Sequence, residues 1–173
     1  MNLVTCTFDQ NAPAILAIFN DAIANSTALY EYQPRTMDTI RAWFDAKAKG
    51  NFPVLGLEDE NGTLMGFASY GAFRAFAAYK YTVEHSVYVD QRYRGRGVGR
   101  HLLGEIVDAA KAQHSHMMIG GIDAENAASI ALHQSLGFTH CASIKQAGFK
   151  FGRWLDLEFY QLLLPTPEQP MDG

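Results

Sequence analysis

The chain has 173 residues, a length that predicts one domain with its own hydrophobic core. Its composition, 48% hydrophobic and 18% charged, is ordinary for a globular protein and excludes a disordered, collagen-like or disulfide-dense class. Fourteen basic against eighteen acidic residues leave a formal charge of −4, which argues against a general binder of nucleic acid or of anionic membranes.

Targeting and redox signals are weak in this sequence. The first ten residues carry neither a basic region nor an apolar stretch, so we expect no secretory signal. The longest stretch without charge, 126–144, is too polar for a bilayer span. Cys6 and Cys141 are the only cysteines, and neither they nor the six histidines have metal-ligand spacing. We expect a cytoplasmic protein with reduced thiols, no metal and no membrane segment.

The first half of the chain alternates between strand and helix patterns. The expected elements are a strand at 3–7, a helix after Pro13, a helix at 37–49, and strands at 54–58 and 64–70. Asn61 and Gly62 lie between the last two strands and suit the positive φ angles of a tight hairpin turn. We therefore expect those two strands to be antiparallel.

The strand at 81–89 is the most informative element of the second half. Its odd positions are mainly apolar, whereas Glu84 and Ser86 lie among the even positions, so one face should be packed and the other polar. A loop, a helix at 97–113, a strand at 117–122, a helix at 127–136 and strands at 139–146 and 155–164 follow. This order predicts an α/β (α+β) domain over residues 3–164, with a mixed sheet, helices on both faces, and a loose tail at 165–173.

The segment RGRGVGR, residues 94–100, directly follows that strand and opens a helix. Its glycines let the backbone approach a ligand, and the N–H groups at the start of a helix favour phosphate. The dinucleotide fingerprint GxGxxG fails because Arg100 stands at its last glycine, and no GxxxxGK[ST] loop is present. A glycine-containing turn with solvated arginines is the structural alternative.

This loop resembles the pyrophosphate loop of the GNAT superfamily of N-acetyltransferases, R/Q-x-x-G-x-G/A, through Arg94, Gly97 and Gly99. A second segment, from Asn126 through His133 to Gly137 and Phe138, is similar to that family's segment in which an asparagine is followed by a tyrosine and then by Gly-Phe. The resemblance implies a splayed, mostly antiparallel GNAT sheet and acetyl-CoA as the co-substrate. It assigns cofactor binding to Asn126, through the pantetheine arm, and to the loop residues Arg94, Gly95, Arg96, Gly97, Val98, Gly99 and Arg100.

The closer resemblance, over residues 3–164, is to the phosphinothricin and methionine sulfone/sulfoximine N-acetyltransferases. It is carried by the stretch from Phe73 to Val89, by the loop, and by AGFKFGRWLD at 147–156. It implies a small amino-acid analogue as substrate, transfer to its α-amine, and a homodimer. An enzyme for another small amine or for a protein N-terminus, and a non-catalytic acyl-CoA-binding module, remain the alternatives.

Glu84 and His133 are the expected catalytic residues. An α-ammonium group is mostly protonated at pH 7, so acetyl transfer needs a base, and Glu84 matches the glutamate of the family's E-x-[ST]-V-Y-V pattern. His133 stands where many relatives have a tyrosine that protonates the departing thiolate. An imidazole is chemically suited to that step, although His133 could instead pair with Glu84, or be structural. His85 should point to the opposite face and pack.

Backbone and loop groups complete the expected site. The resemblance implies that N–H groups of Val87, Tyr88 and Val89, freed by a bulge, polarise the acetyl carbonyl during direct attack in a ternary complex. Arg74 is the candidate ligand of the substrate carboxylate. Phe76 stands where many phosphinothricin enzymes have a second basic residue, which favours a neutral sulfone or sulfoximine tip over a phosphinate.

Overall fold

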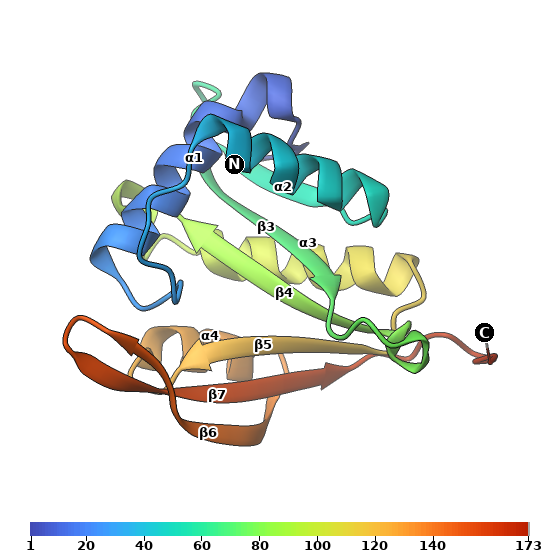
Figure 1. The fold of residues 1–173 in the computed structure, drawn as a ribbon. Coiled ribbons are helices and arrows are strands. Elements are labelled where there is room, and N and C mark those ends of the chain that lie inside the picture. Colours follow the sequence, from blue (N-terminus) through green and yellow to red (C-terminus); the bar gives the residue numbers. More distant parts are fainter. Residues whose placement is uncertain (173) are drawn as a thin grey trace. The chain divides into compact units, whose positions relative to one another are not determined.

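A computed structural model describes residues 1–172, with four α-helices and seven strands in that part of the chain (Figure 1). In chain order these are β1 (Asn2–Thr5), α1 (Phe8–Asn25), α2 (Met37–Lys49), β2 (Val54–Glu58), β3 (Leu64–Ala72), β4 (Thr82–Val89), α3 (Val98–Ala112), β5 (Met117–Asp123), α4 (Ala127–Ser135), β6 (Thr139–Lys150) and β7 (Arg153–Leu163). Short 3₁₀ turns lie at Ala77–Tyr79 and Gln91–Tyr93.

The strands form a seven-stranded sheet in the order β1-β2-β3-β4-β5-β7-β6. β1–β2, β2–β3, β5–β7 and β6–β7 are antiparallel, whereas β4 and β5 are parallel. Hydrogen bonds from Phe73 N–H to Thr82 and from Asp90 N–H to Met65 join the two ends of the β3–β4 pair in one antiparallel register. The predicted mixed, mostly antiparallel sheet is thus confirmed.

The Cα positions divide the chain into two compact units. The first unit comprises Met1–Tyr70 and Ser86–Ile106, and the second comprises Gly71–His85 and the chain from Val107 on. The boundary crosses β3, β4 and α3, so each of these elements contributes residues to both units.

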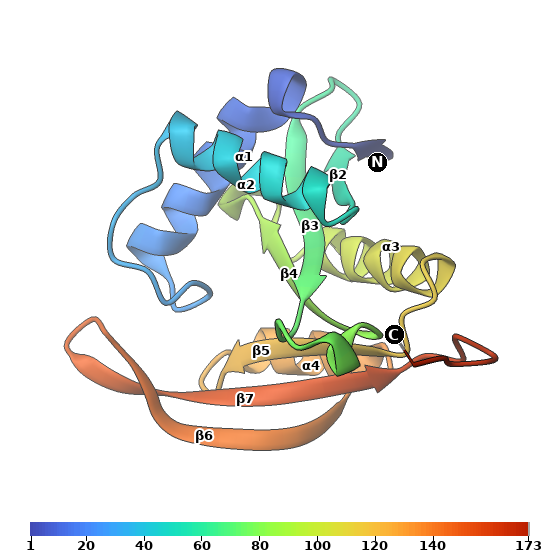
Figure 2. The same ribbon diagram turned by 45° about the vertical axis from the view of Figure 1, so that its right-hand side comes forward.

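In the first unit, helices cover both faces of the sheet (Figure 2). Phe67 of β3 packs against Phe19 of α1, with ring centroids 4.9 Å apart, in a buried cluster that includes Ile40 of α2. A Cβ added at the neighbouring Gly66 would lie 3.2 Å from the Leu102 side chain of α3. Because successive strand residues face opposite sides, α1 and α2 cover one face and α3 covers the other.

Local signals explain why these helices begin where they do. The Thr7 hydroxyl accepts the Gln10 N–H at the start of α1, and Thr36 with Thr39 forms a capping box at α2. α1 therefore begins at Phe8 and includes Pro13, which the sequence interpretation had placed before the helix. Two contacts stabilise this first part of the helix. The Asn11 side chain accepts the Thr7 N–H, and Ala12 is buried.

The second unit contains β5, β7, β6 and α4, the last capped by Asn126, whose side chain accepts the Ser129 N–H. β6 is longer than expected, because Asp156 of β7 binds the Gln146 N–H where the register shifts and pairing then resumes at Gly148. The tail after Leu164, which was predicted to be loose, has no helix or strand in residues 165–172 and forms hydrogen bonds to the rest of the second unit. The Met171 carbonyl accepts the Tyr81 hydroxyl, and the Thr166 hydroxyl donates to Ser115.

Candidate active site

Glu84 lies on β4, where the strand pairs with Ile119 of β5. Its carboxylate faces the Gly121 side of β5, since a Cβ added at Gly121 would be 3.4 Å from Glu84 Oε1. The Leu157 and Phe159 side chains of β7 border the same position. Burial raises the pKa of Glu84 above its usual value, and the positive charge of Arg74 partly opposes that shift. Glu84 is therefore a half-buried carboxylate whose basicity is increased by lost hydration.

The next residue, His85, points to the opposite face of the strand and meets His133 of α4. Their Nε2 atoms are 3.0 Å apart, and the ring planes differ by 21°. Gly120 of β5 makes room for the pair, because a Cβ there would lie 2.7 Å from His85 Nε2 and 3.1 Å from His133 Nε2. Phe138 packs edge-on against both rings.

Hydrogen bonds define the proton positions in this histidine pair. His133 Nδ1 lies 2.7 Å from the Ser129 carbonyl, which can only accept, so Nδ1 carries the proton. Burial lowers the pKa of His85 to about 3 and also lowers that of His133, so both rings are neutral at pH 7. Neutral His133 then has a bare Nε2, and His85 donates its own Nε2–H to it. The remaining atom, His85 Nδ1, is buried and has no hydrogen-bond partner within the described chain.

This arrangement corrects two expectations for His133. The ring does not pair with Glu84, because alternation puts Glu84 and His85 on opposite faces of β4 and His133 contacts His85. Its single ring proton is bound to the Ser129 carbonyl, and its other nitrogen accepts from His85. Neither nitrogen is available to donate directly to a thiolate, so the structure favours a structural role. The expectation that His85 packs on this face is confirmed.

The end of β4 presents backbone donors on the side away from β3. In the β3–β4 register, the even residues Glu84, Ser86 and Tyr88 direct their N–H groups toward β3, and the odd residues direct theirs away. β5 is paired with Thr82–Glu84 only, so the N–H groups of Val87 and Val89 lie beyond that pairing. The Val87 and Val89 N–H groups therefore point away from β3 and lie past the last residue of β4 that pairs with β5.

Tyr88 departs from the prediction in both its backbone and its side chain. Its N–H faces β3, so the predicted set of three donors reduces to Val87 and Val89. Its ring packs against Phe19 and Phe67, with centroids 4.9 Å and 5.5 Å away. The even face of β4 was expected to be polar, but in the first unit it is lined by the aromatic core under α1.

The loop after β4 has the backbone that its glycines suggest. Gly95 and Gly97 have φ angles of 74° and 81°, values that residues with a side chain rarely adopt. A Cβ added at either glycine would have no atom within 4 Å, so the space above the loop is open. The first α3 hydrogen bond runs from His101 N–H to the Gly97 carbonyl. The N–H groups of Val98, Gly99 and Arg100 thus form the positive end of the helix, as phosphate binding requires.

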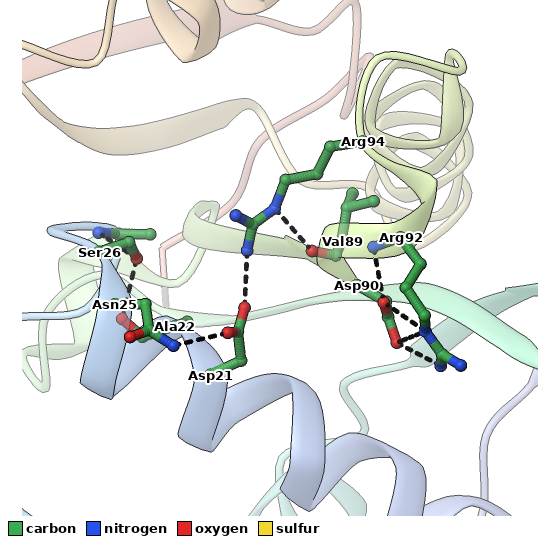
Figure 3. A network of polar contacts seen from close by, with 9 residues as sticks. Asp21, Ala22, Asn25, Ser26, Val89, Asp90, Arg92 and Arg94 are labelled. Carbon is green, nitrogen blue, oxygen red and sulfur yellow. Dashed lines mark hydrogen bonds and ion pairs between the residues drawn. The ribbon is translucent and has the colours of Figure 1, made fainter.

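The loop arginines have different surroundings (Figure 3). Arg92 forms an ion pair with Asp90 at 2.7 Å. Arg94 was predicted to bind the cofactor, but its guanidinium contacts Asp21 at 2.9 Å and the Val89 carbonyl at 3.2 Å. Arg96 lies over the Tyr93 ring at 5.5 Å, and Arg100 is exposed in the first turn of α3. The Arg94 guanidinium is therefore engaged by protein groups of the first unit.

The remaining predicted residues lie in the second unit. Arg74 is exposed, with its guanidinium 5.1 Å from the Phe73 ring, and its charge acts on Glu84. Phe73 forms ring contacts with Tyr79 and Phe159, whereas Phe76 is 77% exposed. Arg74 and Glu84 are thus brought together, and Phe76 points into solvent instead of lining the site.

Sequence reasoning missed four residues that position functional groups. Gly120 and Gly121 leave room for neighbouring side chains on opposite faces of β5. Two consecutive glycines inside a strand were the sequence signal that could have identified them. His85 was treated only as a packed residue, without its bond to His133. Asp21 lies 73 residues before its partner Arg94, so no local pattern could have identified it.

Residues 1–172 contain neither a membrane-spanning helix nor a cluster of metal-ligating side chains. No helix in that range is long and apolar enough to cross a membrane. No group of three or more His, Cys, Asp or Glu side chains there is arranged to hold a metal ion.

A positive-φ glycine loop at a strand-to-helix junction, next to a strand with free backbone donors, is the arrangement of an acyl-CoA-dependent transferase. The acetyltransferase (GNAT) family model matches residues 15–138, and the chain belongs to that family. It is an acetyl-CoA-dependent N-acetyltransferase, as its relatives indicate.

Two curated relatives are informative. The chain is 48% identical over 159 residues to an L-methionine sulfoximine/L-methionine sulfone acetyltransferase of Pseudomonas paraeruginosa, covering 91% of this chain and 92% of that protein. It is 34% identical to a phosphinothricin N-acetyltransferase of Alcaligenes faecalis, covering 88% and 78%. The solved structure of an acetyltransferase from Salmonella typhimurium with its cofactor acetyl-CoA has a TM-score of 0.93 and 42% identity, covering 99% of this chain and 98% of that one.

Proposed function

We propose that the protein transfers an acetyl group from acetyl-CoA to the α-amine of a small amino-acid analogue of the methionine sulfoximine or sulfone type. The observation that carries this proposal is the half-buried Glu84 carboxylate with a raised pKa and a neighbouring arginine. A base of this kind suits an α-ammonium group, and the guanidinium suits an α-carboxylate. The names of the relatives support the same substrate class.

On the cofactor side, the chain supplies hydrogen-bond donors and an open backbone. The N–H groups around Gly95, Gly97 and the first turn of α3, with Arg96 and Arg100, would bind the pyrophosphate. The Val87 and Val89 N–H groups would polarise the acetyl carbonyl. Asn126 uses its side-chain oxygen to cap α4, which leaves its amide nitrogen for the pantetheine arm. Acetyl-CoA supplies the activated acetyl thioester.

On the substrate side, Glu84 would take a proton from the ammonium group, directly or through one water, and so produce the neutral amine that attacks. We propose direct attack in a ternary complex, because Cys6 is buried with its pKa raised to about 12 and is a poor nucleophile. Arg74 would bind the carboxylate. The names of the relatives support a sulfone or sulfoximine tip.

The test is thiol release from acetyl-CoA across a panel of amines. We expect methionine sulfone or sulfoximine to exceed phosphinothricin in kcat/KM, and a clear preference for phosphinothricin would contradict the assignment of the pocket. Preference for another small amine or a peptide N-terminus would replace the substrate class. CoA binding without turnover of any amine would indicate a non-catalytic acyl-CoA-binding module.

We further propose that the enzyme acts in the cytoplasm as a homodimer and detoxifies amino-acid analogues of this kind. Support for the dimer comes from the β6–β7 hairpin, where Phe149, Phe151 and Trp154 are 46%, 55% and 59% exposed. Light scattering at micromolar concentration tests this assembly, since a monomer near 19.2 kDa would exclude it.

A further inference from the structure

The Arg94 side chain is held by two groups of the first unit (Figure 3). Its Nη2 donates to Asp21 Oδ2 of α1 at 2.9 Å, and its Nε donates to the Val89 carbonyl at 3.2 Å. The second carboxylate oxygen of Asp21 accepts the Asn25 amide at 2.8 Å, which fixes the Asp21 rotamer. The Asp21 side chain is 20% exposed, so this ion pair is partly shielded from water.

The Val89 carbonyl faces the same side as the proposed acyl-binding donors. In a strand, the N–H and C=O of one residue point in the same direction, so this oxygen lies on the side of the Val87 and Val89 N–H groups, away from β3. An unpaired carbonyl there would repel the acyl oxygen that the donors attract. The Arg94 guanidinium donates an N–H to this carbonyl and keeps the local potential positive.

We propose that Asp21 is a positioning residue of the acetyl-CoA site, acting through Arg94. The carboxylate orients the guanidinium onto the Val89 carbonyl and fixes the first residue of the glycine loop relative to the end of β4. In this arrangement Arg94 holds the loop in place, and the loop N–H groups and Arg96 contact the phosphates. The inference rests on the proposed cofactor site at residues 94–100.

Two possible roles of Arg94 predict opposite effects of Asp21→Asn. Arg94 is either a brace, which holds the loop in place, or a direct ligand of the phosphate. If Arg94 is a brace, loss of the carboxylate loosens the guanidinium, and acetyl-CoA binds about threefold to fivefold more weakly, the upper part of the range for an exposed ion pair. If Arg94 is a phosphate ligand restrained by Asp21, the same change frees it and acetyl-CoA binds more tightly.

The experiment compares wild type, Asp21→Asn, Arg94→Gln and the double variant. Titration with CoA gives Kd, and steady-state assays give KM for acetyl-CoA and kcat. For a brace, the two single changes weaken CoA binding and raise KM for acetyl-CoA by a similar factor, and the double variant is no weaker than Arg94→Gln. Asp108→Asn, which removes the exposed Asp108–Lys111 pair of α3, is the matched control and should leave KM unchanged.

Three results would overturn the proposal. They are tighter CoA binding in Asp21→Asn, a wild-type KM in Asp21→Asn while Arg94→Gln weakens binding, or additive losses in the double variant. Thermal unfolding identifies a misfolded variant, and Asp21→Glu, which keeps the charge, should then retain more affinity than Asp21→Asn. If wild type itself fails to bind CoA, the proposed function is wrong, and that outcome is separate from any of these.

Discussion

Glu84 and His85 are adjacent on β4, yet the two faces of the strand use burial in opposite ways. Desolvation disfavours the charged form of both groups, so it raises the pKa of the carboxyl and lowers that of the imidazole to about 3. The first shift moves Glu84 toward neutral pH and makes it a stronger base. The second moves His85 away from neutral pH and keeps the ring uncharged. One physical cause therefore produces a candidate base on one face and a neutral structural pair on the other.

The largest expected effect is on the Glu84 face. Glu84→Gln keeps the size of the side chain and removes the base, so kcat should fall by about 10² to 10⁴ while CoA affinity stays near wild type. Higher pH should partly restore the rate, because solution then supplies neutral amine. Steady-state kinetics from pH 6 to 10 measure both effects. Retention of more than about a third of kcat, with chemistry rate-limiting, would contradict the role of base.

The same variant has a stability signature with a defined sign. A carboxyl whose folded pKa is raised binds more protons in the folded than in the unfolded state, so its ionisation costs stability above the unfolded pKa. That cost is recovered as the pH falls through the folded pKa. Glu84→Gln should therefore unfold at the same or a higher temperature at pH 7, which separates a lost base from a damaged fold.

Arg74→Ala should give the next largest effect, again on the Glu84 face. Loss of hydrogen bonds to a charged group costs about 1.5–3 kcal/mol, so kcat/KM for a substrate with a free α-carboxylate should fall about tenfold to a hundredfold. The matching carboxamide should lose much less. Equal losses for acid and amide would mean that Arg74 does not bind the carboxylate. Arg153→Ala, which removes another exposed arginine of the second unit, is the control.

The two glycines of β5 test the comparison directly, since each admits a side chain on one face. Gly120→Ala puts a methyl group 2.7 Å from His85 Nε2, and overpacking of this kind costs about 1–3 kcal/mol of stability. Gly121→Ala meets its nearest atom, Glu84 Oε1, at an ordinary 3.4 Å and should cost less. Denaturant unfolding of both variants measures the difference. Equal losses would mean that Gly120 is not needed to accommodate the histidine pair.

The two faces also differ in how far sequence could predict them. Alternation and the E-x-[ST]-V-Y-V resemblance identified Glu84, and glycine spacing identified the loop, because these signals are local. The His85–His133 contact joins residues 48 apart, and the Asp21–Arg94 contact joins residues 73 apart. The sheet order was inaccessible for the same reason. Pairing of β5 with β7, and not with β6, depends on contacts between distant strands.

The smallest expected effect is the response of the histidine face to acid. A histidine whose folded pKa is lowered contributes stability that is complete above the unfolded pKa near 6.5 and is lost as the pH falls toward the folded value, about 3 for His85. His85→Gln keeps an N–H donor for His133 and cannot titrate. The free energy of unfolding of this variant should therefore fall less steeply between pH 6.5 and 4, by at most about 1.4 kcal/mol per pH unit.

Chemical unfolding at several pH values in that window measures the slope. A wild-type slope in His85→Gln would mean that His85 accepts a proton in the folded state, for example through the unpartnered Nδ1 atom. Its ring would then be charged near neutral pH, His133 would have a source of protons, and the contrast between the two faces of β4 would be lost.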